Sequence, residues 1–459
     1  MPSSRRRAWW VLTAAGVLVL LAVAYLVIPV RQRLASAPTR RAEPSAVVKN
    51  SKSWEEVDRD IAARFAPHFY QGVIGRGRFD YITNFDFDGD WNGNNNWEHA
   101  ADDHYRLKAY VYYSVSETPT HYFIHYAAFH PRDWKGGEKT GRFLSGTIRE
   151  GTTMGGTIRA RGVLDDLVLS HENDLEGCLV VVGKRGPDLE SARVVFVETM
   201  AHNQYLRFAP APGAGAAATL RLDDQHPLLY VEAQGHGIEA FVGQPVRGAG
   251  DSEPSPYEDD EAPKKSRFAR MKSVAKVKDL LTDRLRVEGK PTDLLLYRFA
   301  GAAEDPETIA SGSIGYDLLP LFTTFWKAAS TGENDSFGEA VDYGTRSIVV
   351  VALGKGGVPT VAPRQVRIGK IGSALRGVAG GQNKARPPWG WFDKSERNRP
   401  LGEWFFDPAG TVLRHRGATI ERWATAYLHE PFLGVIRDPS IATTADQAAA
   451  APVGVPFGR

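Results

Sequence analysis

Residues 170–182 read SHENDLEGCLVVV, a polar segment that runs directly into an apolar strand. Asp174 and Glu176 are two residues apart, so on an extended chain their side chains point to the same face. His171 is expected in the preceding loop, from which it can fold back toward them. One imidazole and two carboxylates at a strand end suit a divalent metal with nitrogen and oxygen ligands. A structural network of paired, buried acids is the alternative interpretation.

Other stretches share the β-branched and aromatic richness of strands and are bounded by turn residues. They span residues 107–115, 121–129, 177–182, 193–198, 228–233, 294–299 and 347–353. Short strands without regular intervening helices predict an all-β fold, a β-sandwich with long loop insertions. The loop at residues 183–187 is expected to join two antiparallel strands.

Composition places the chain among globular proteins, with 459 residues, 42% of them hydrophobic and 24% charged. The first 50 residues carry eight basic groups and one acid, which leaves a net charge of −5 on residues 51–459. A slightly acidic body argues against nucleic acid as a partner. The single cysteine, Cys178, excludes an intramolecular disulfide and a multi-thiolate metal site.

The N-terminal region contains 23 uncharged residues, 8–30, flanked by arginines on both sides. This run is long enough to cross a hydrocarbon core about 30 Å thick. We expect an uncleaved signal anchor, one transmembrane helix that leaves a cytoplasmic N-terminus and an extracytoplasmic body at the cell membrane. The alternative is a secreted protein, cleaved near Ala37 after the small residues Ala35 and Ser36.

The chain divides by composition into five parts. They are an anchor and stalk (1–50), a β-sandwich core with the metal site (51–250), a charged linker and helix (251–292), a continuation of the sandwich or a second β-rich domain (293–440), and a disordered tail (441–459). The basic stretch at 264–286 is interpreted as a solvated helix, with a membrane-surface helix as the alternative.

A second candidate cation site lies upstream, in the sequence DFDGDWNG at residues 86–93. Asp86, Asp88, Asp90 and Asn92 offer oxygen ligands at alternate positions, as in the opening of a calcium loop. The twelfth position counted from Asp88 is His99 instead of Glu, so the EF-hand pattern fails at its bidentate ligand. The alternative is an Asx-rich turn that bonds its own backbone.

Two histidines, His202 and His236, each follow a strand-like run. Together with Asp133 they predict a group of polar, metal-competent side chains at one rim of a sandwich. Either histidine is a candidate for moving a proton, which makes them the candidate catalytic residues.

Three strings, PRD at residues 131–133, SHENDLEG at 170–177 and AHNQY at 201–205, occur in an order that resembles the necrosis- and ethylene-inducing-like cytolysins. The resemblance implies a β-sandwich and a site for Ca²⁺ or Mg²⁺. The matching metal positions are Asp133, His171, Asp174 and Glu176, with His202 as a nearby polar member. Leu175 departs from the family's tryptophan, and the N-terminal anchor has no counterpart there, so toxin activity is not expected to carry over.

The chain is also similar to bacterial and fungal proteins related to vacuolar protein sorting protein sixty-two. The likeness rests on SHENDxE, on a strand from Pro227 that ends in Gly235-His236, and on PPWGW at 387–391 with WFxDP at 404–408. It spans about residues 65–250 and 387–408, which favours one interrupted domain with 251–292 as an insertion.

These observations predict a membrane-anchored, extracytoplasmic protein that binds a divalent cation and, through it, a glycan or glycolipid. Trp91, Trp97 and Trp134 could supply sugar-stacking faces or could be core. One alternative is a metal-dependent hydrolase that uses the same rim site. Another is a structural protein that the cation stabilises.

Overall fold

A computed structural model of the chain describes residues 52–73, 77–133, 171–210, 218–243, 293–309, 312–331, 335–355, 358–377, 385–396, 399, 401–416, 423–438 and 441. The predicted membrane segment (8–30), the charged segment (251–292) and residues 442–459 of the predicted tail lie outside this part. Within the described ranges, no helix has the length and apolar character needed to span a membrane.

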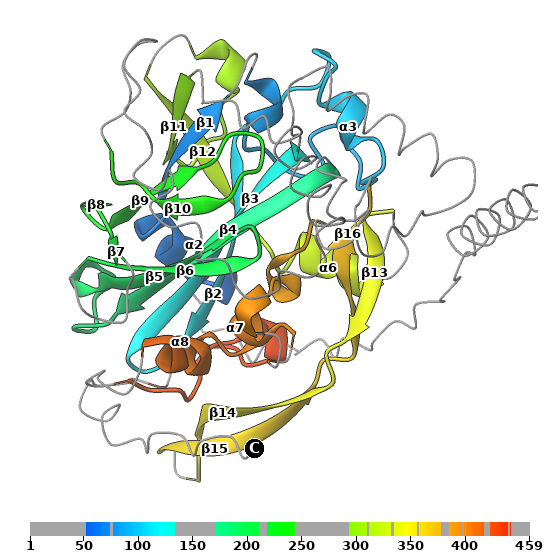
Figure 1. The fold of residues 1–459 in the computed structure, drawn as a ribbon. Coiled ribbons are helices and arrows are strands. Elements are labelled where there is room, and N and C mark those ends of the chain that lie inside the picture. The colour runs from blue at the N-terminus through cyan, green and yellow to red at the C-terminus, as the bar shows by residue number, and fades with distance from the viewer. Residues whose placement is uncertain are drawn as a thin grey trace, which may run out of the picture.

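One 12-stranded sheet dominates the described residues, in the order β10-β9-β1-β11-β12-β2-β3-β4-β5-β6-β7, with β8 beside β9 (Figure 1). Its strands are β1 His68–Val73, β2 Tyr110–Glu117, β3 His121–Asp133, β4 His171–Gly183, β5 Arg193–Ala201, β6 Gln204–Ala209, β7 Ala218–Thr219, β8 Leu222–Asp223, β9 His226–Val231, β10 Ile238–Ala240, β11 Asp293–Phe299 and β12 Ser313–Pro320. Every predicted strand segment overlaps a strand of the structure.

The strands β2 to β6 form an antiparallel meander, which includes the predicted β4–β5 pair. β3 and β4 are the longest strands, 13 residues each, and pair along nearly their whole length. β11 and β12 come much later in the sequence but lie between β1 and β2, so the C-terminal half contributes strands to the same sheet.

The all-β fold class is confirmed, but the arrangement differs from two separate sheets packed face to face. The described strands of the large sheet are continuous, and the sheet curls until β10 contacts β4 and β5. The natural twist of neighbouring strands accumulates across so many strands and brings the β10 edge of the sheet against β4 and β5.

An inner core fills the concave side of the curled sheet and is closed by α2 Trp54–Arg64. It contains Ile61 and Ala62 from this helix and the even-numbered residues Cys178, Val180 and Val182 of β4. α2 begins with a capping box, in which the Ser53 side chain accepts from the backbone of Glu56.

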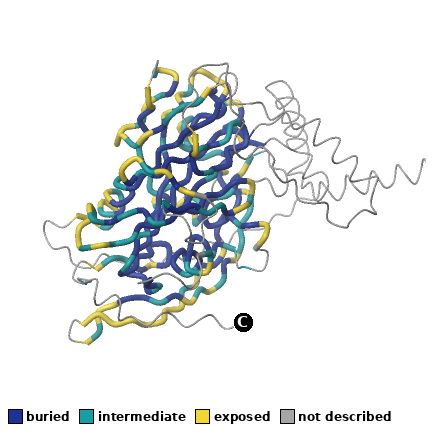
Figure 2. Tube along the Cα trace, turned by 60° about the vertical axis from the view of Figure 1, so that its left-hand side comes forward, coloured by how far each residue is buried: buried dark blue, intermediate teal, exposed yellow. Residues whose placement is uncertain are grey.

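An outer core covers the opposite face of the sheet. Leu179 and Val181 of β4 pack there against the C-terminal elements, with Trp389 fully buried among them. These elements are α6 Phe325–Thr331, β13 Phe337–Asp342, β14 Thr345–Leu353, β15 Pro359–Arg367, β16 Lys370–Leu375, η6 Pro388–Gly390, α7 Glu403–Phe406 and α8 Pro408–Arg416. Because both faces of the sheet are covered, odd- and even-numbered residues of β4 are both buried. Figure 2 shows buried residues through the middle of the molecule.

Candidate functional site

The polar ends of β3 and β4 form the base of the candidate site. In this ladder Asp133 lies opposite His171, and His130 lies opposite Asp174. His171 is therefore the first residue of β4, instead of a loop residue that folds back, as the sequence suggested. Asn173 lies between His171 and Asp174 and has a positive φ of 62°, so the simple alternation of an extended strand does not hold across it.

Asp133 and His171 form one buried acid–imidazole pair. The carboxylate Oδ2 lies 3.3 Å from His171 Nε2, and His171 Nδ1 donates to the carbonyl of Asn173 at 2.8 Å. Burial lowers the pKa of His171, but the carboxylates of Asp133 and Asp174 outweigh this effect and raise it overall. The resemblance to the cytolysins named these two residues together as metal ligands, which stays a prediction.

His236 lies between two carboxylates from different elements. Its Nδ1 faces Asp174 Oδ2 at 3.0 Å, and its Nε2 faces Asp80 Oδ1 at 3.3 Å. His236 lies in the turn between β9 and β10, and Asp80 is the last residue of the 3-10 helix η1 Arg78–Asp80. Burial alone would lower the pKa of His236, but hydrogen bonds and charges from Asp174 and Asp80 raise it to about 9.

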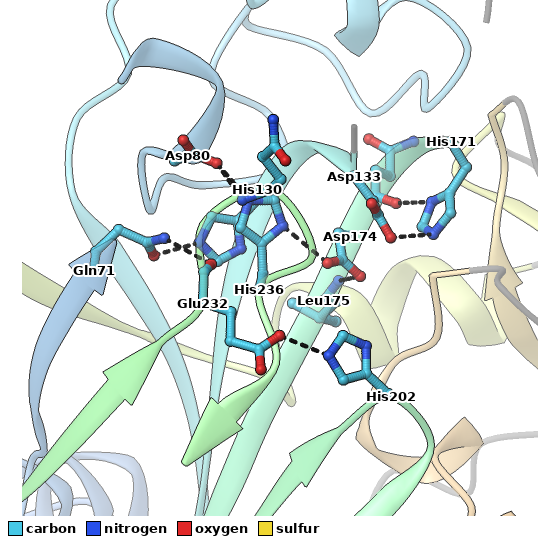
Figure 3. Close-up of polar contacts among 12 residues, drawn as sticks. Gln71, Asp80, His130, Asp133, His171, Asp174, Leu175, His202, Glu232 and His236 are labelled. Atoms are coloured by element: carbon cyan, nitrogen blue, oxygen red, sulfur yellow. Dashed lines mark hydrogen bonds and ion pairs between the residues drawn. The ribbon is translucent and has the colours of Figure 1, made fainter. Parts of the chain in front are cut away.

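His130 stacks on His236, with ring centroids 3.7 Å apart and planes within 1° of parallel (Figure 3). Its Nε2 lies 3.0 Å from Gln71 Oε1 of β1. Burial, with a smaller contribution from His236, holds the pKa of His130 well below its usual range. The stack therefore combines a neutral imidazole with an imidazolium.

The backbone around this cluster is strained. Asn173, Gln234 and His236 have positive φ angles of 62°, 68° and 53°, which cost of order 1–3 kcal/mol each for residues other than glycine. Local hydrogen bonds hold two of them in place. Asn173 Nδ2 donates to the carbonyls of Gly93 and Arg376, and the Gln234 amide donates to Asp80.

A second, accessible acid–imidazole pair lies beside the buried cluster. His202 Nε2 is 2.6 Å from Glu232 Oε2, and both side chains are partly exposed. His202 occupies the β5–β6 turn, and Glu232 follows β9. Burial and the neighbouring Glu232 raise the pKa of Glu239 on β10 to about 7. This surface group is connected to the buried one because Gln71 Nε2 donates to the carbonyl of Glu232.

The remaining predicted residues lie nearby with different surroundings. Glu176 is half-buried two positions beyond Asp174 on β4, opposite Ala128. In the predicted calcium loop, the side chains of Asp88, Asp90 and Asn92 each accept from the backbone amide two residues further on. This is the geometry of the Asx-turn alternative.

Asp86 and His99 complete this loop. Asp86 accepts from Asn84 Nδ2 at 2.9 Å. His99 Nδ1 lies 2.5 Å from Asp88 Oδ2, so the residue at the twelfth position does approach the first one.

The tryptophans near the motifs differ in exposure. Trp97 is buried, and the Arg132 guanidinium lies 4.4 Å from its ring centroid. Trp97 is therefore core and not a sugar-stacking face. Trp91 is half-buried against Phe85, and Trp134 lies outside the described residues.

Sequence reasoning missed four members of the site, His130, Gln71, Asp80 and Glu232. His130 lies within the quoted FHPRD segment, but its role depends on the β3–β4 register that places it opposite Asp174. Gln71 and Asp80 come from segments without a recognisable motif. Residues 124–130, IHYAAFH, show no alternation of polar and apolar side chains, so no local pattern indicates which face of the strand His130 occupies.

Comparisons with known proteins were made for the whole chain. No family model matches it, and no curated protein matches it. Neither comparison therefore supports the similarity to vacuolar protein sorting protein sixty-two.

Several solved structures match part of the chain. One described as a toxin fold for microbial attack and plant defense is 18% identical, with a TM-score of 0.22, over 40% of this chain and 67% of its own. A complex of NLPPya with mannosamine is 19% identical, with a TM-score of 0.22, over 40% and 65%. Necrosis and Ethylene inducing Protein 2, from the causal agent of cocoa's Witches Broom disease, is 16% identical, with a TM-score of 0.22, over 39% and 67%. TM-scores this low assign neither fold nor function.

Proposed function

We propose that this protein is a divalent-cation-binding module, held at the cell membrane by residues 8–30 with its body extracytoplasmic, that binds a glycan or glycolipid. One observation carries the cation proposal. Two buried carboxylates lie at the same end of β3 and β4, and each faces a histidine: Asp133 faces His171, and Asp174 faces His236. Buried charge requires compensation, and a bound cation supplies it.

The residues present fit a divalent ion by their chemistry. Asp133, His171, Asp174 and Glu176 are the predicted ligand set for Ca²⁺ or Mg²⁺, and the first three are buried at the same strand end. Asp174 is central because it also faces His236. A bound ion would supply positive charge and an attachment point for ligand oxygens.

The ligand side of the proposal rests on the surface pair His202–Glu232. A side chain at Gly237, next to His236, would come within 3.1 Å of Glu232 Oε2 and 3.2 Å of His202 Nε2. Glycine therefore leaves room beside polar groups that can hydrogen-bond sugar hydroxyls. Trp91 is the half-buried aromatic residue available for stacking.

The cation test measures metal content in the full-length protein, purified in detergent, by plasma mass spectrometry. We expect about one equivalent of a divalent ion, lost in Asp174→Asn. The matched control is Asp342→Asn, an exposed carboxylate paired with Arg367, which should retain the ion. Absence of any divalent ion from the wild-type protein would overturn the proposal.

The ligand and location are tested separately. Glycan and glycolipid arrays probed with and without chelator should give cation-dependent signals, and blank arrays in the presence of the ion would refute ligand binding. For location, protease added to intact cells should digest the body. Resistance to external protease would contradict the extracytoplasmic body.

A second candidate function is metal-dependent hydrolysis, favoured by the accessible His202–Glu232 pair. A carboxylate that orients an exposed imidazole is the arrangement of a general base. His236 is fully buried with a carboxylate on each nitrogen, which disfavours it as the proton-moving group. Phosphodiester and ester substrates test this function, which requires turnover that depends on both the metal and His202.

A further inference from the structure

Three buried side chains offer a set of metal ligands that differs from the predicted one. His130, Asp174 and His236 are each at most 5% exposed, and one donor atom of each lies within 4.8 Å of the others. They come from β3, from β4 and from the turn between β9 and β10 (Figure 3). Asp174 is already oriented, because its Oδ1 accepts from the Leu175 amide at 2.9 Å.

Hydrogen bonds define the tautomer of His130. Gln71 Nε2 donates to the carbonyls of Gly72 and Glu232, which turns Gln71 Oε1 toward His130. Oε1 only accepts, so His130 Nε2 carries the hydrogen and Nδ1 presents a lone pair. Within the described part of the chain, this fully buried Nδ1 has no hydrogen-bond partner. A buried acceptor left in this way is unfavourable, and a bound ion would satisfy it.

His236 is oriented in the same way, with Nδ1 toward Asp174 and Nε2 toward a hydrogen-bond acceptor. Its Nε2 donates to Asp80, whose Oδ1 also accepts from the Gln234 amide at 2.7 Å. When an ion replaces the proton on Nδ1, the Nε2–H bond to Asp80 remains. Each histidine would then bind through Nδ1 while its Nε2 is held by an acceptor, Gln71 or Asp80. Metal-binding histidines are typically oriented by such a hydrogen bond.

The donor types select the ion. Two imidazole nitrogens and one carboxylate suit Zn²⁺ and related transition metals, whereas Ca²⁺ takes six to eight oxygens and Mg²⁺ prefers oxygen ligands and water. We propose that His130, Asp174 and His236 bind a transition-metal ion of the zinc class. This proposal rests on the proposed cation-binding function and names its ion and ligands.

Binding requires one local movement. The two rings lie in parallel planes with centroids 3.7 Å apart, so their in-plane lone pairs cannot meet at one point. A zinc ion about 2.0–2.1 Å from each nitrogen needs lone pairs that converge. The two rings must therefore rotate apart, and the stack opens when the ion enters.

The test uses the full-length protein in detergent, without an affinity tag, stripped with chelator and titrated with Zn²⁺ against a chromophoric competitor. We expect about one equivalent bound by the wild type and at least tenfold weaker binding in His130→Gln and in His236→Gln. The matched control is His104→Gln, which removes an exposed histidine outside the cluster and should retain zinc binding. Thermal unfolding in chelator verifies that each variant is folded.

Each outcome has a distinct meaning. If Ca²⁺ or Mg²⁺ binds and is lost in His171→Gln while zinc does not bind, the inference is overturned and the cation-binding function survives. If no divalent ion binds, both fail. If the histidine variants do not fold, the visible absorption spectrum of the wild-type protein loaded with Co²⁺ tests the proposal instead. Visible bands of nitrogen and oxygen ligation support the site, and the spectrum of free aqueous Co²⁺ refutes it.

Discussion

The imidazole of His130 lies flat against that of His236, with ring centroids 3.7 Å apart. One ring belongs to a strand in the middle of the sheet, and the other to a turn near its curled edge. Burial keeps the first neutral, and two carboxylates keep the second charged. The contact therefore couples the closure of the sheet to the charge state of the site.

Removing one of the two carboxylates beside His236 should destabilise the metal-free protein. In Asp80→Asn the buried imidazolium keeps only Asp174 as a charged partner, and we expect a loss of about 1–3 kcal/mol in the free energy of unfolding. Urea denaturation in chelator measures it. Asp342→Asn, at an exposed ion pair, should leave the midpoint unchanged, and an equal effect of both substitutions would contradict the prediction.

Asn173 should contribute through both its side chain and its backbone. Its amide bonds Gly93, Arg376 and Asn96, so Asn173→Ala is expected to cost about 3 kcal/mol through unpaired buried groups. Asn173→Gly loses the same bonds but tolerates the φ of 62°. It should therefore be more stable than the alanine variant by about 1 kcal/mol. Chemical denaturation of both variants tests this, and equal stabilities would exclude backbone strain.

Glu430 should make the protein less stable as the pH rises. Burial raises the pKa of this carboxyl to about 8, with further contributions from Asp58 and Asp407, while a hydrogen bond from Ser116 opposes the rise. The folded state then holds a proton that the unfolded state releases near pH 4.5, so stability falls between about pH 4.5 and 8.

Glu430→Gln, which mimics the protonated acid, should flatten this decline. Thermal unfolding at pH 5 and pH 8 measures the difference, and the variant should gain over the wild type only at pH 8. A variant that parallels the wild type at both pH values would show that Glu430 titrates normally.

Trp389 should be essential to the packing of the C-terminal elements on the sheet. It is fully buried, stacks edge-on against Trp326 and donates its indole hydrogen to the carbonyl of Gly372. We expect Trp389→Ala to cost about 3–5 kcal/mol. Val358→Ala, at an exposed position, is the control. Retention of wild-type stability in Trp389→Ala would mean that the outer core does not depend on this residue.

The strands and the identity of several site residues were predictable from sequence because their signals are local. Residues 177–182 are apolar, residues 121–129 are apolar or aromatic apart from two histidines, and each segment is part of a long strand. The resemblance to the cytolysins named Asp133 and His171 together, as positions of one metal site. The curl of a single sheet was not predictable, since twist accumulates over pairings between distant segments.

The sequence by itself determined the segments of seven strands, β2, β3, β4, β5, β9, β11 and β14, and the polar residues that accompany several of them. Only the tertiary structure decided which of those groups meet. The register of β3 on β4 places His130 opposite Asp174, and the curl of the sheet brings the turn after β9 over them with His236. Side-chain neighbours across strands depend on long-range register, which local sequence patterns do not encode.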